Sequence, residues 1–402
     1  MDVLARFLNY VSYHTTSDEE SETYPSTARQ KLLGAHLAEE LRAMGIENAH
    51  MDDFGCVYAY LEANDPAAGD DAIGLISHMD TAPAAPGDNI NARVINYEGG
   101  DIALSETEIT AVKEFPFLEN YKGQRLVVTD GTTLLGADDK AGVAEIVTAV
   151  EYLLSHPEVK RRGVAVCFTP DEEVGRGTEH FDFSQFHANR AYTVDGGALG
   201  EIEYENFNAA AATLRVKGVN IHPGSAKGKM KNAALLAAEF VSMLPAAETP
   251  AHTEGYEGFF HLCEIHGDEN AATVKLIVRD HDLAKFTGRK QRLERMASYL
   301  NSVYGEGTFS LEITDSYYNM KKKILPHFDL ITDAEKAFRA AGALPKTVPI
   351  RGGTDGAMLS YKGLPCPNLS TGGENFHGVH EFVSVDAMET MVKVLVELCK
   401  AR

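Results

Sequence analysis

The stretch Ala72-Ile-Gly-Leu-Ile-Ser-His-Met-Asp80 joins a run of apolar residues directly to a histidine and an aspartate. A short, continuous apolar run is typical of a strand that is buried on both faces of a parallel sheet. Two later runs repeat the pattern: 164–169 leads into the paired glutamates 172–173, and 191–194 leads into Asp195. Ligands of open α/β sheets bind beyond the carboxyl ends of the strands, so these polar tips are expected to meet in one crevice.

Segments with helical periodicity alternate with these strands. Apolar residues recur at helical spacing over 2–12, over 28–44 and in the segment that opens at Gly136. The same helical spacing of apolar residues recurs later in the chain, at 331–341 and 385–400. Strands that alternate with helices predict an α/β fold built on a mostly parallel sheet.

The order of predicted strands and helices changes in the region between residues 208 and 316. The pattern there predicts a strand, a helix, two strands, a helix and a strand, at 208–217, 231–244, 258–266, 271–280, 283–304 and 308–316. The order βαββαβ is that of a ferredoxin-like domain. A chain of 402 residues is also long for one hydrophobic core. We therefore expect a small domain, 208–316, inserted into a larger domain formed by 1–207 and 317–402.

Composition and charge exclude several classes of partner. The chain carries 37 Lys and Arg against 59 Asp and Glu, a net charge of −22, which argues against a nucleic acid or an anionic membrane as partner. No apolar stretch approaches the roughly 18 to 20 residues of a membrane helix, and the N-terminus lacks the features of a signal peptide. The five cysteines are dispersed and odd in number, which favours free thiols in a reducing compartment, the cytoplasm.

The residues at the strand tips are suited to hold metal ions. They offer imidazole and carboxylate groups without thiolates, which favours a catalytic pair of zinc-like ions over a structural zinc. Each residue also has a plainer interpretation. Asp138-Asp139 at a helix start complements the helix dipole, paired glutamates often form a solvated turn, and His377 and His380 lie in a Gly-rich loop where histidines are often exposed. Only the combination favours a metal site.

Six motifs occur in the order seen in the co-catalytic zinc aminopeptidase, aminoacylase and carboxypeptidase superfamily. They are His78-Met-Asp80, Gly136-Ala-Asp-Asp-Lys140, Asp171-Glu-Glu173, Asp195-Gly-Gly197, Arg351-Gly-Gly-Thr-Asp355 and His377-x-x-x-Glu381. Longer blocks, such as Phe168-Thr-Pro-Asp-Glu-Glu-Val-Gly175 and Asp315-Ser-Tyr-Tyr-Asn-Met320, resemble the tripeptide aminopeptidases of that superfamily. The resemblance covers essentially the whole chain and implies an enzyme that releases the N-terminal residue from tripeptides.

The resemblance also implies a set of metal ligands. Asp138 is expected to bridge two metal ions. His78 and Asp195 would complete one site, and Glu173 and His377 would complete the other. Two Zn²⁺ ions per subunit fit this ligand set, and Mn²⁺ or Co²⁺ would also suit a carboxylate-rich pair.

Two of these assignments are choices between near neighbours. Asp138 is preferred to Asp139 because it matches the family's Asp-x-Lys spacing. His377 is preferred to His380 because it stands four residues before Glu381. The family pattern further implies a cis peptide bond between Asp138 and Asp139, a costly feature that functional sites tolerate.

By the same resemblance, two residues take part in the chemistry. Asp80 would hold the His78 imidazole in its metal-binding tautomer. Glu172 would be the general base, which removes a proton from a metal-bound water as that water attacks the scissile carbonyl. The same carboxyl group would later deliver the proton to the departing amine.

Five further residues are expected to contact the substrate. By resemblance, His222 would steady the developing oxyanion, while Asn232 and Arg279 would hold the peptide backbone and its free carboxylate. A helix cap is an equally good account of Asn232, and an ordinary surface charge is the plainer account of Arg279. Arg351 and Asp355 lie beside the site by motif. They either order the Gly-rich loop or, for Asp355, receive the substrate amine.

Other functions stay open on the sequence alone. A sister activity on dipeptides or N-acyl amino acids would use the same metals with different pocket walls. A metal-dependent binding protein without turnover is disfavoured because the base Glu172 is present. The small domain is expected to close over a small peptide substrate, and homodimers through that domain are common in the superfamily.

Overall fold

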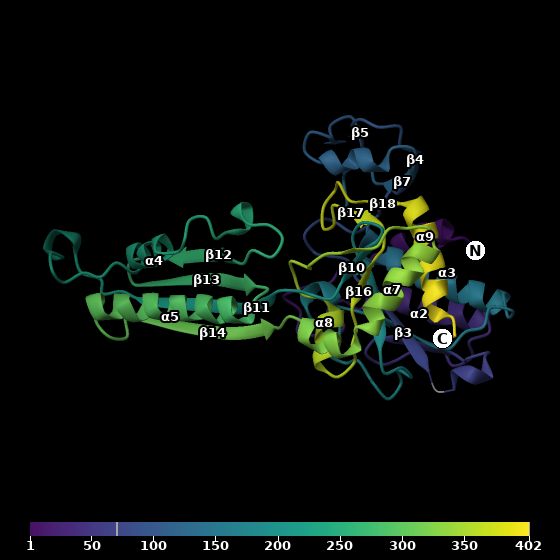
Figure 1. Ribbon diagram of the computed structural model, residues 1–402. Helices are drawn as coiled ribbons and strands as arrows, with labels where there is room; N and C mark the ends of the chain where they lie inside the picture. Colours follow the sequence, from purple (N-terminus) through teal and green to yellow (C-terminus); the bar gives the residue numbers. More distant parts are fainter. Residues whose placement is uncertain (70, 402) are drawn as a thin grey trace. The chain divides into compact units, whose positions relative to one another are not determined.

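The computed structural model describes residues 1–69 and 71–401 (Figure 1). The chain divides into two compact units. Unit 1 comprises Met1–Tyr204, Lys322–Val348 and Thr354–Arg402, and unit 2 comprises Glu205–Lys321 and Pro349–Gly353. Unit 2 thus contains the region from which the sequence predicted a small domain, together with a few flanking residues and a second, short segment.

Unit 1 is built on an eight-stranded sheet. Its strands, in spatial order, are β1 (His50–Met51), β2 (Val57–Leu61), β8 (Gly163–Thr169), β3 (Ala72–His78), β9 (Ala191–Gly196), β16 (Asn368–Ser370), β10 (Glu201–Glu203) and β15 (Lys346–Thr347). The pairs β8–β3, β3–β9, β9–β16 and β10–β15 are parallel, and the other three pairs are antiparallel. The α/β class is confirmed, with a mixed sheet that is parallel at its centre.

Helices cover both faces of this sheet. They are α1 (Val3–Val11), α2 (Gln30–Ala43), α3 (Ala137–Ser155), α7 (Asp329–Ala340), α8 (Asp355–Tyr361) and α9 (Val385–Cys399), besides the short α6 (Lys321–Ile324). On one face α3 lies close to the sheet because Gly142 has no side chain: a Cβ atom there would lie 1.9 Å from the Val194 carbonyl oxygen and 2.6 Å from Ser77 Oγ. Ile76 points to the opposite face, where it packs with Leu359 of α8.

A second sheet of unit 1 pairs strands from the chain between β3 and α3 with strands from the segment before α9 (Figure 1). Its strands, in order, are β17 (Gly373–Glu374), β18 (Phe382–Ser384), β7 (Arg125–Val128) and β4 (Arg93–Asn96), and a two-stranded ribbon of β5 (Ile102–Ala103) and β6 (Ile109–Thr110) lies in the same stretch of chain. Leu104, Leu118 and Phe382 belong to its own small core. This core is what orders a stretch in which the sequence shows almost no periodicity.

Unit 2 is a four-stranded antiparallel sheet with two helices. The sheet order is β12 (Phe259–Gly267), β13 (Ala271–Asp280), β11 (Asn208–Lys217) and β14 (Phe309–Tyr317), and the helices are α4 (Ala233–Ser242) and α5 (Leu283–Tyr304). Small residues of β11, such as Ala210 and Ala212, pack in one core with Phe240 of α4 and Leu293 of α5. Both helices therefore cover the same face, and unit 2 has a hydrophobic core of its own.

The predicted helices and strands agree with the structure to within two residues at each end. The elements that the sequence did not reveal are short. The strands β10, β15 and β16 have two or three residues each, too few to show a period of two. These strands form because neighbouring strands in the sheet accept their backbone hydrogen bonds.

Two expectations from composition can be compared with the structure. Over residues 1–69 and 71–401, no helix is long and apolar enough to cross a membrane. All five cysteines are free, four of them buried and Cys263 exposed. The prediction of free thiols is confirmed.

A buried acid in the central sheet couples stability to pH. Glu203 of β10 is 9% exposed, and its carboxyl group accepts a hydrogen bond of 2.6 Å from Asn368 Nδ2. Burial raises the pKa of Glu203 from an ordinary 4.5 to about 8, although the Asn368 hydrogen bond opposes the rise. The folded protein then holds a proton that the unfolded chain releases. The resulting stabilisation is complete below the unfolded pKa and is lost as the pH rises through the folded pKa.

Glu203→Gln should remove this pH dependence. With the native residue, the group lowers the free energy of unfolding by about 1.4 kcal/mol per pH unit between the two pKa values. Glutamine keeps the hydrogen bond to Asn368 without carrying a charge. Denaturation midpoints at pH 5 and pH 8 should differ less in the variant than in the native protein. The exposed Glu158→Gln is the control, and an equal pH dependence of Glu203→Gln and the native protein would contradict this account.

Candidate metal centre

The ends of neighbouring strands carry the candidate ligands. Strand β3 ends at His78, β8 leads into the short 3-10 turn Glu172–Val174, and β9 contains Asp195 next to its end. Because β8, β3 and β9 are adjacent and parallel, their carboxyl ends lie at the same edge of the sheet. Asp138 joins them from the start of α3.

Asp138 lies between the two candidate histidines. Its Oδ1 atom is 2.9 Å from His78 Nε2, and its Oδ2 atom is 3.1 Å from His377 Nε2. Each histidine also meets a second acid. His78 Nε2 is 3.3 Å from Asp195 Oδ1, and His377 Nε2 is 3.0 Å from Glu173 Oε2. The five predicted ligands therefore lie together, in two groups that share Asp138.

The buried carboxylate of Asp80 joins the tips of β3 and β8. Its Oδ1 atom lies 3.3 Å from His78 Nδ1 and accepts a hydrogen bond of 3.0 Å from the backbone N–H of Glu172. Its Oδ2 atom accepts a hydrogen bond of 3.2 Å from the backbone N–H of Glu173. Asp80 thus orients the His78 ring and holds the turn that carries both glutamates.

Asp171 anchors the other side of that turn. It has a left-handed backbone (φ +60°), an unfavourable conformation for a residue with a side chain. Its carboxylate accepts hydrogen bonds from the backbone N–H of Ser26 at 2.6 Å and from Gln30 Nε2 at 2.6 Å. Sequence reasoning missed this role. Ser26 and Gln30 lie more than 140 residues away along the chain, so no local pattern reveals the contact.

Glu381 holds the loop that leads into α3. Its carboxylate accepts backbone hydrogen bonds from Leu135 at 2.7 Å, Gly136 at 2.8 Å and Asp138 at 3.0 Å. In the sequence Glu381 served only as a marker of spacing. In the structure one short segment supplies both the candidate ligand His377 and the acid that positions the Asp138 loop.

His380 is directed away from Asp138. Its Nε2 atom is 3.3 Å from Glu108, and its Nδ1 atom is 3.1 Å from Thr110 Oγ1. Both partners belong to the chain between β3 and α3, so His380 ties that stretch to the loop. Of the two histidines in the Gly-rich loop, only His377 faces the acids of the group.

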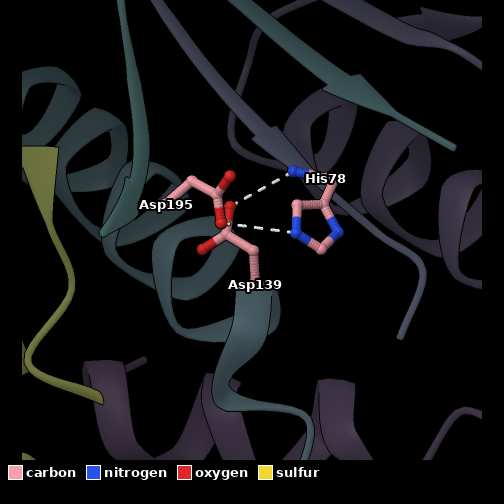
Figure 2. Close-up of side chains that lie close together, drawn as sticks. All are labelled: His78, Asp139 and Asp195. Carbon is pink, nitrogen blue, oxygen red and sulfur yellow. Dashed lines mark hydrogen bonds and ion pairs between the residues drawn. The ribbon is translucent and has the colours of Figure 1, made fainter. Parts of the chain in front are cut away.

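The other choice between near neighbours was that of Asp138 over Asp139 as the metal ligand. The carboxylate of Asp139 lies with His78 and Asp195 in a group whose ligand atoms are within 4.8 Å of one another (Figure 2). Its oxygens, however, accept backbone hydrogen bonds of 3.2 Å each, Oδ2 from His78 and Oδ1 from Gly142. The imidazole ring of His78 faces Asp138 instead. The peptide bond between Asp138 and Asp139 is cis, as predicted.

The electrostatics of the group favour added positive charge. Burial raises the pKa of Asp195 and that of Glu173 to about 7. Hydrogen bonds to Asp138 and Glu173 raise the pKa of His377 to about 11. Burial lowers the pKa of His78, but Asp195 and Asp138 outweigh it and hold this pKa well above its ordinary value. Several buried carboxylates lie together here and raise the pKa of the neighbouring histidines. Divalent cations bound at this place would compensate the negative charge of the carboxylates.

The residues present fit a pair of divalent cations. Glu173 Oε1 is buried and has no hydrogen-bond partner in the part of the chain that the structure describes. The donor set of imidazoles and carboxylates without thiolates suits Zn²⁺ and similar ions. Next to the ligands, burial raises the pKa of Glu172 well above its ordinary value.

Of the predicted substrate residues, only Asp355 belongs to unit 1. It is the first residue of α8, is 5% exposed, and accepts a hydrogen bond of 2.8 Å from Thr169 Oγ1 at the end of β8. Burial raises its pKa to about 6. The carboxylate is therefore engaged inside unit 1, where it ties α8 to the strand that carries the glutamates.

His222 and Asn232 belong to unit 2, where each side chain caps the start of a helical segment. His222 is exposed, and its Nδ1 atom accepts a hydrogen bond of 3.2 Å from the backbone N–H of Gly224. Asn232 is the N-cap of α4, and its Oδ1 atom accepts a hydrogen bond of 3.1 Å from the backbone N–H of Leu235. The capping account of Asn232 is thus observed, and it does not conflict with a second role.

Arg279 and Arg351 also belong to unit 2 and lie side by side. Arg279 Nη1 donates to the Arg351 carbonyl oxygen at 3.1 Å, while Arg279 Nε is buried without a hydrogen-bond partner among the described residues. Arg351 Nη1 donates to the carbonyl oxygens of Gly255 and Glu257, at 2.8 and 3.0 Å. These hydrogen bonds explain why the segment around Arg351 belongs to unit 2.

Comparison with known proteins identifies the family. Residues 125–401 match Peptidase family M20/M25/M40. The chain belongs to this family. Peptidase T of Caldanaerobacter subterraneus subsp. tengcongensis is 51% identical over 399 residues, which cover 98% of this chain and 97% of that protein. Membership of the peptidase T branch, expected from the sequence motifs, is confirmed.

Solved structures share the fold of the whole chain. An aminopeptidase PepT from Bacillus cereus and a tripeptidase from Staphylococcus aureus each give a TM-score of 0.76, at 21% and 20% identity. Each match covers 99% of this chain and 97% of the other. At this identity the likeness shows a common M20 fold.

Asp138→Asn and Asp139→Asn form a matched pair that tests which acid binds metal. Asp138→Asn removes the carboxylate shared by the two ligand groups, so the metal content after dialysis should fall. Asp139→Asn should keep its metal but lose stability by about 1–3 kcal/mol, because one backbone N–H loses its acceptor. Elemental analysis and denaturation curves measure both effects. Loss of metal from the Asp139 variant alone would move the ligand to Asp139.

Proposed function

We propose that this chain is a two-metal aminopeptidase that releases the N-terminal residue from tripeptides. The observation that carries the proposal is Asp138, whose carboxylate oxygens face two different histidines at 2.9 and 3.1 Å. One carboxylate shared by two ligand groups suits a pair of neighbouring cations. The identity of 51% with a peptidase T over almost the whole chain supports a tripeptide as substrate.

The proposed ligands divide into two sites. Asp138 is the shared ligand, His78 and Asp195 complete one site, and Glu173 and His377 complete the other. Zinc is the proposed metal, and manganese or cobalt would suit the same donors. When bound, such cations polarise the scissile carbonyl group and make a water molecule more acidic.

Glu172 is the proposed general base. It stands next to the ligand Glu173 in a turn that Asp80 and Asp171 hold from both sides. The carboxyl group takes the proton of the attacking water and returns it to the amine that leaves. Asp80 acts as a positioning residue, since it fixes the backbone of Glu172 and the ring of His78 together.

Unit 2 is proposed as the ferredoxin-like lid that receives the rest of the peptide. His222 would steady the oxyanion, Asn232 would hold the peptide backbone, and Arg279 would bind the free carboxylate. The partnerless Nε of Arg279 and the neighbouring charge of Arg351 support an anion site there. Closure of the lid, a homodimer through unit 2 and a cytoplasmic location are parts of the same proposal. Scattering curves with and without a non-hydrolysed inhibitor test the closure.

A panel of substrates tests the activity. The metal-loaded protein should hydrolyse Ala-Ala-Ala faster than Ala-Ala, Ala-Ala-Ala-Ala or N-acetyl-Ala. The alternatives within the family, a dipeptidase or an N-acyl amino acid hydrolase, would reverse this order. A clear preference for N-acetyl-Ala would overturn the aminopeptidase proposal.

Glu172→Ala tests the general base. Its kcat for Ala-Ala-Ala should fall by at least about 10²- to 10⁴-fold, the usual size of a general-base contribution. Metal content and the denaturation midpoint should stay at the native values, because Glu172 is not a proposed ligand. Glu158→Gln, an exposed acid outside the site, is the control. Native activity in Glu172→Ala would remove Glu172 from its role.

A further inference from the structure

Asp171, the residue directly before the proposed base Glu172, is held by its backbone and its side chain together. Its backbone N–H donates to Gln30 Oε1 at 3.1 Å, and its carbonyl oxygen accepts a hydrogen bond of 2.9 Å from the backbone N–H of Arg176. Its carboxylate accepts from the backbone N–H and the hydroxyl group of Ser26, at 2.6 and 2.5 Å, and from Gln30 Nε2 at 2.6 Å. These contacts fix the chain at the point where it enters the turn of the glutamates.

The side chain of Gln30 makes two complementary contacts with Asp171. Gln30 is the first residue of α2 and is completely buried. Its amide oxygen faces a donor, the backbone N–H of Asp171, and its amide nitrogen faces an acceptor, the Asp171 carboxylate. An amide can make both contacts, whereas an ionised carboxylate of the same shape would place an oxygen against the Asp171 carboxylate. The structure therefore uses the amide group itself, and not only the size of the side chain.

The Gln30 contacts support a backbone conformation that is unfavourable by itself. Asp171 has φ +60° and ψ +26°, the left-handed region, in which a residue with a side chain is strained. This conformation sets the direction in which the chain enters the turn, and so it sets the direction of the Glu172 side chain. Asp80 supports the turn from the other side, through the backbone N–H of Glu172. Loss of the Gln30 contacts would thus remove support from one side of the turn only.

We propose that Gln30 is a positioning residue, which aims the carboxyl group of Glu172 by holding Asp171 in its left-handed conformation. The inference rests on the proposed function, in which Glu172 is the general base. A displacement of about 1 Å in a reacting group can cost about 10²-fold in rate. Among the described residues, the hydrogen bonds of the Gln30 side chain reach Ser26, Thr27 and Asp171, none of which is a proposed metal ligand. Gln30 should therefore influence turnover without a change in metal content.

Gln30→Glu tests the proposal, because it exchanges the amide nitrogen for an oxygen and keeps the size of the side chain. The kcat for Ala-Ala-Ala should fall about 10- to 100-fold, while KM and metal content stay near their native values. In the Glu172→Ala background, the same exchange should have little further effect on kcat, because no base is left to aim. A merely structural role would lower kcat by the same factor in both backgrounds.

The reciprocal variant Gln30→Glu/Asp171→Asn moves the amide to the other side of the contact and keeps the native net charge. One donor again faces one acceptor, so kcat should recover about 5-fold or more relative to Gln30→Glu alone. Gln185→Glu is the matched control, because Gln185 Nε2 also donates to an aspartate, Asp182 Oδ2 at 2.7 Å, in a contact that includes no proposed ligand. This control should keep the native kcat.

Native kcat in Gln30→Glu would overturn the inference. Equal losses with and without the Glu172 carboxyl group, loss of metal from Gln30→Glu, or no recovery in the reciprocal variant would also overturn it. If Gln30→Glu does not fold, Gln30→Met, which adds no charge, is measured in the same way in both backgrounds. Failure of the native protein to hydrolyse Ala-Ala-Ala would instead overturn the proposed function.

Discussion

The carboxylate of Asp138, held between His78 and His377, is the contact around which unit 1 is arranged. It is surrounded by other buried acids, and each buried charge needs a partner because water is excluded. The histidines supply positive charge in the structure, and divalent cations would supply more. The need to compensate several carboxylates in one place explains much of the architecture around them.

Three acids around the proposed ligands bind backbone N–H groups. Asp80 holds the turn of the glutamates, Asp139 holds the backbone of His78 and Gly142, and Glu381 holds the loop before α3. Each of these contacts satisfies the acid and at the same time positions a proposed ligand. Residues of one chemical type therefore have different roles, and the role depends on which way the carboxylate points.

Much of the fold could be predicted because its signals are local. Buried strands such as β3 and β8 are continuous apolar runs, and α5 has clear helical periodicity, so their bounds were predicted closely. The strands β10 and β15 could not be predicted, because they are short and exist only through pairing with neighbours. The contacts of Asp171 with Ser26 and Gln30 were missed for the same reason: they join segments that are far apart in the chain.

By itself, the sequence determined the α/β class, the order of elements in unit 2, the free thiols and the family, because motifs and periodicity are properties of neighbouring residues. It also placed three of the candidate ligands, His78, Glu173 and Asp195, at strand ends. Only the tertiary structure shows which partners each of the near neighbours contacts. Whether Asp138 or Asp139, and His377 or His380, faces the other acids depends on backbone turns and on partners from distant segments.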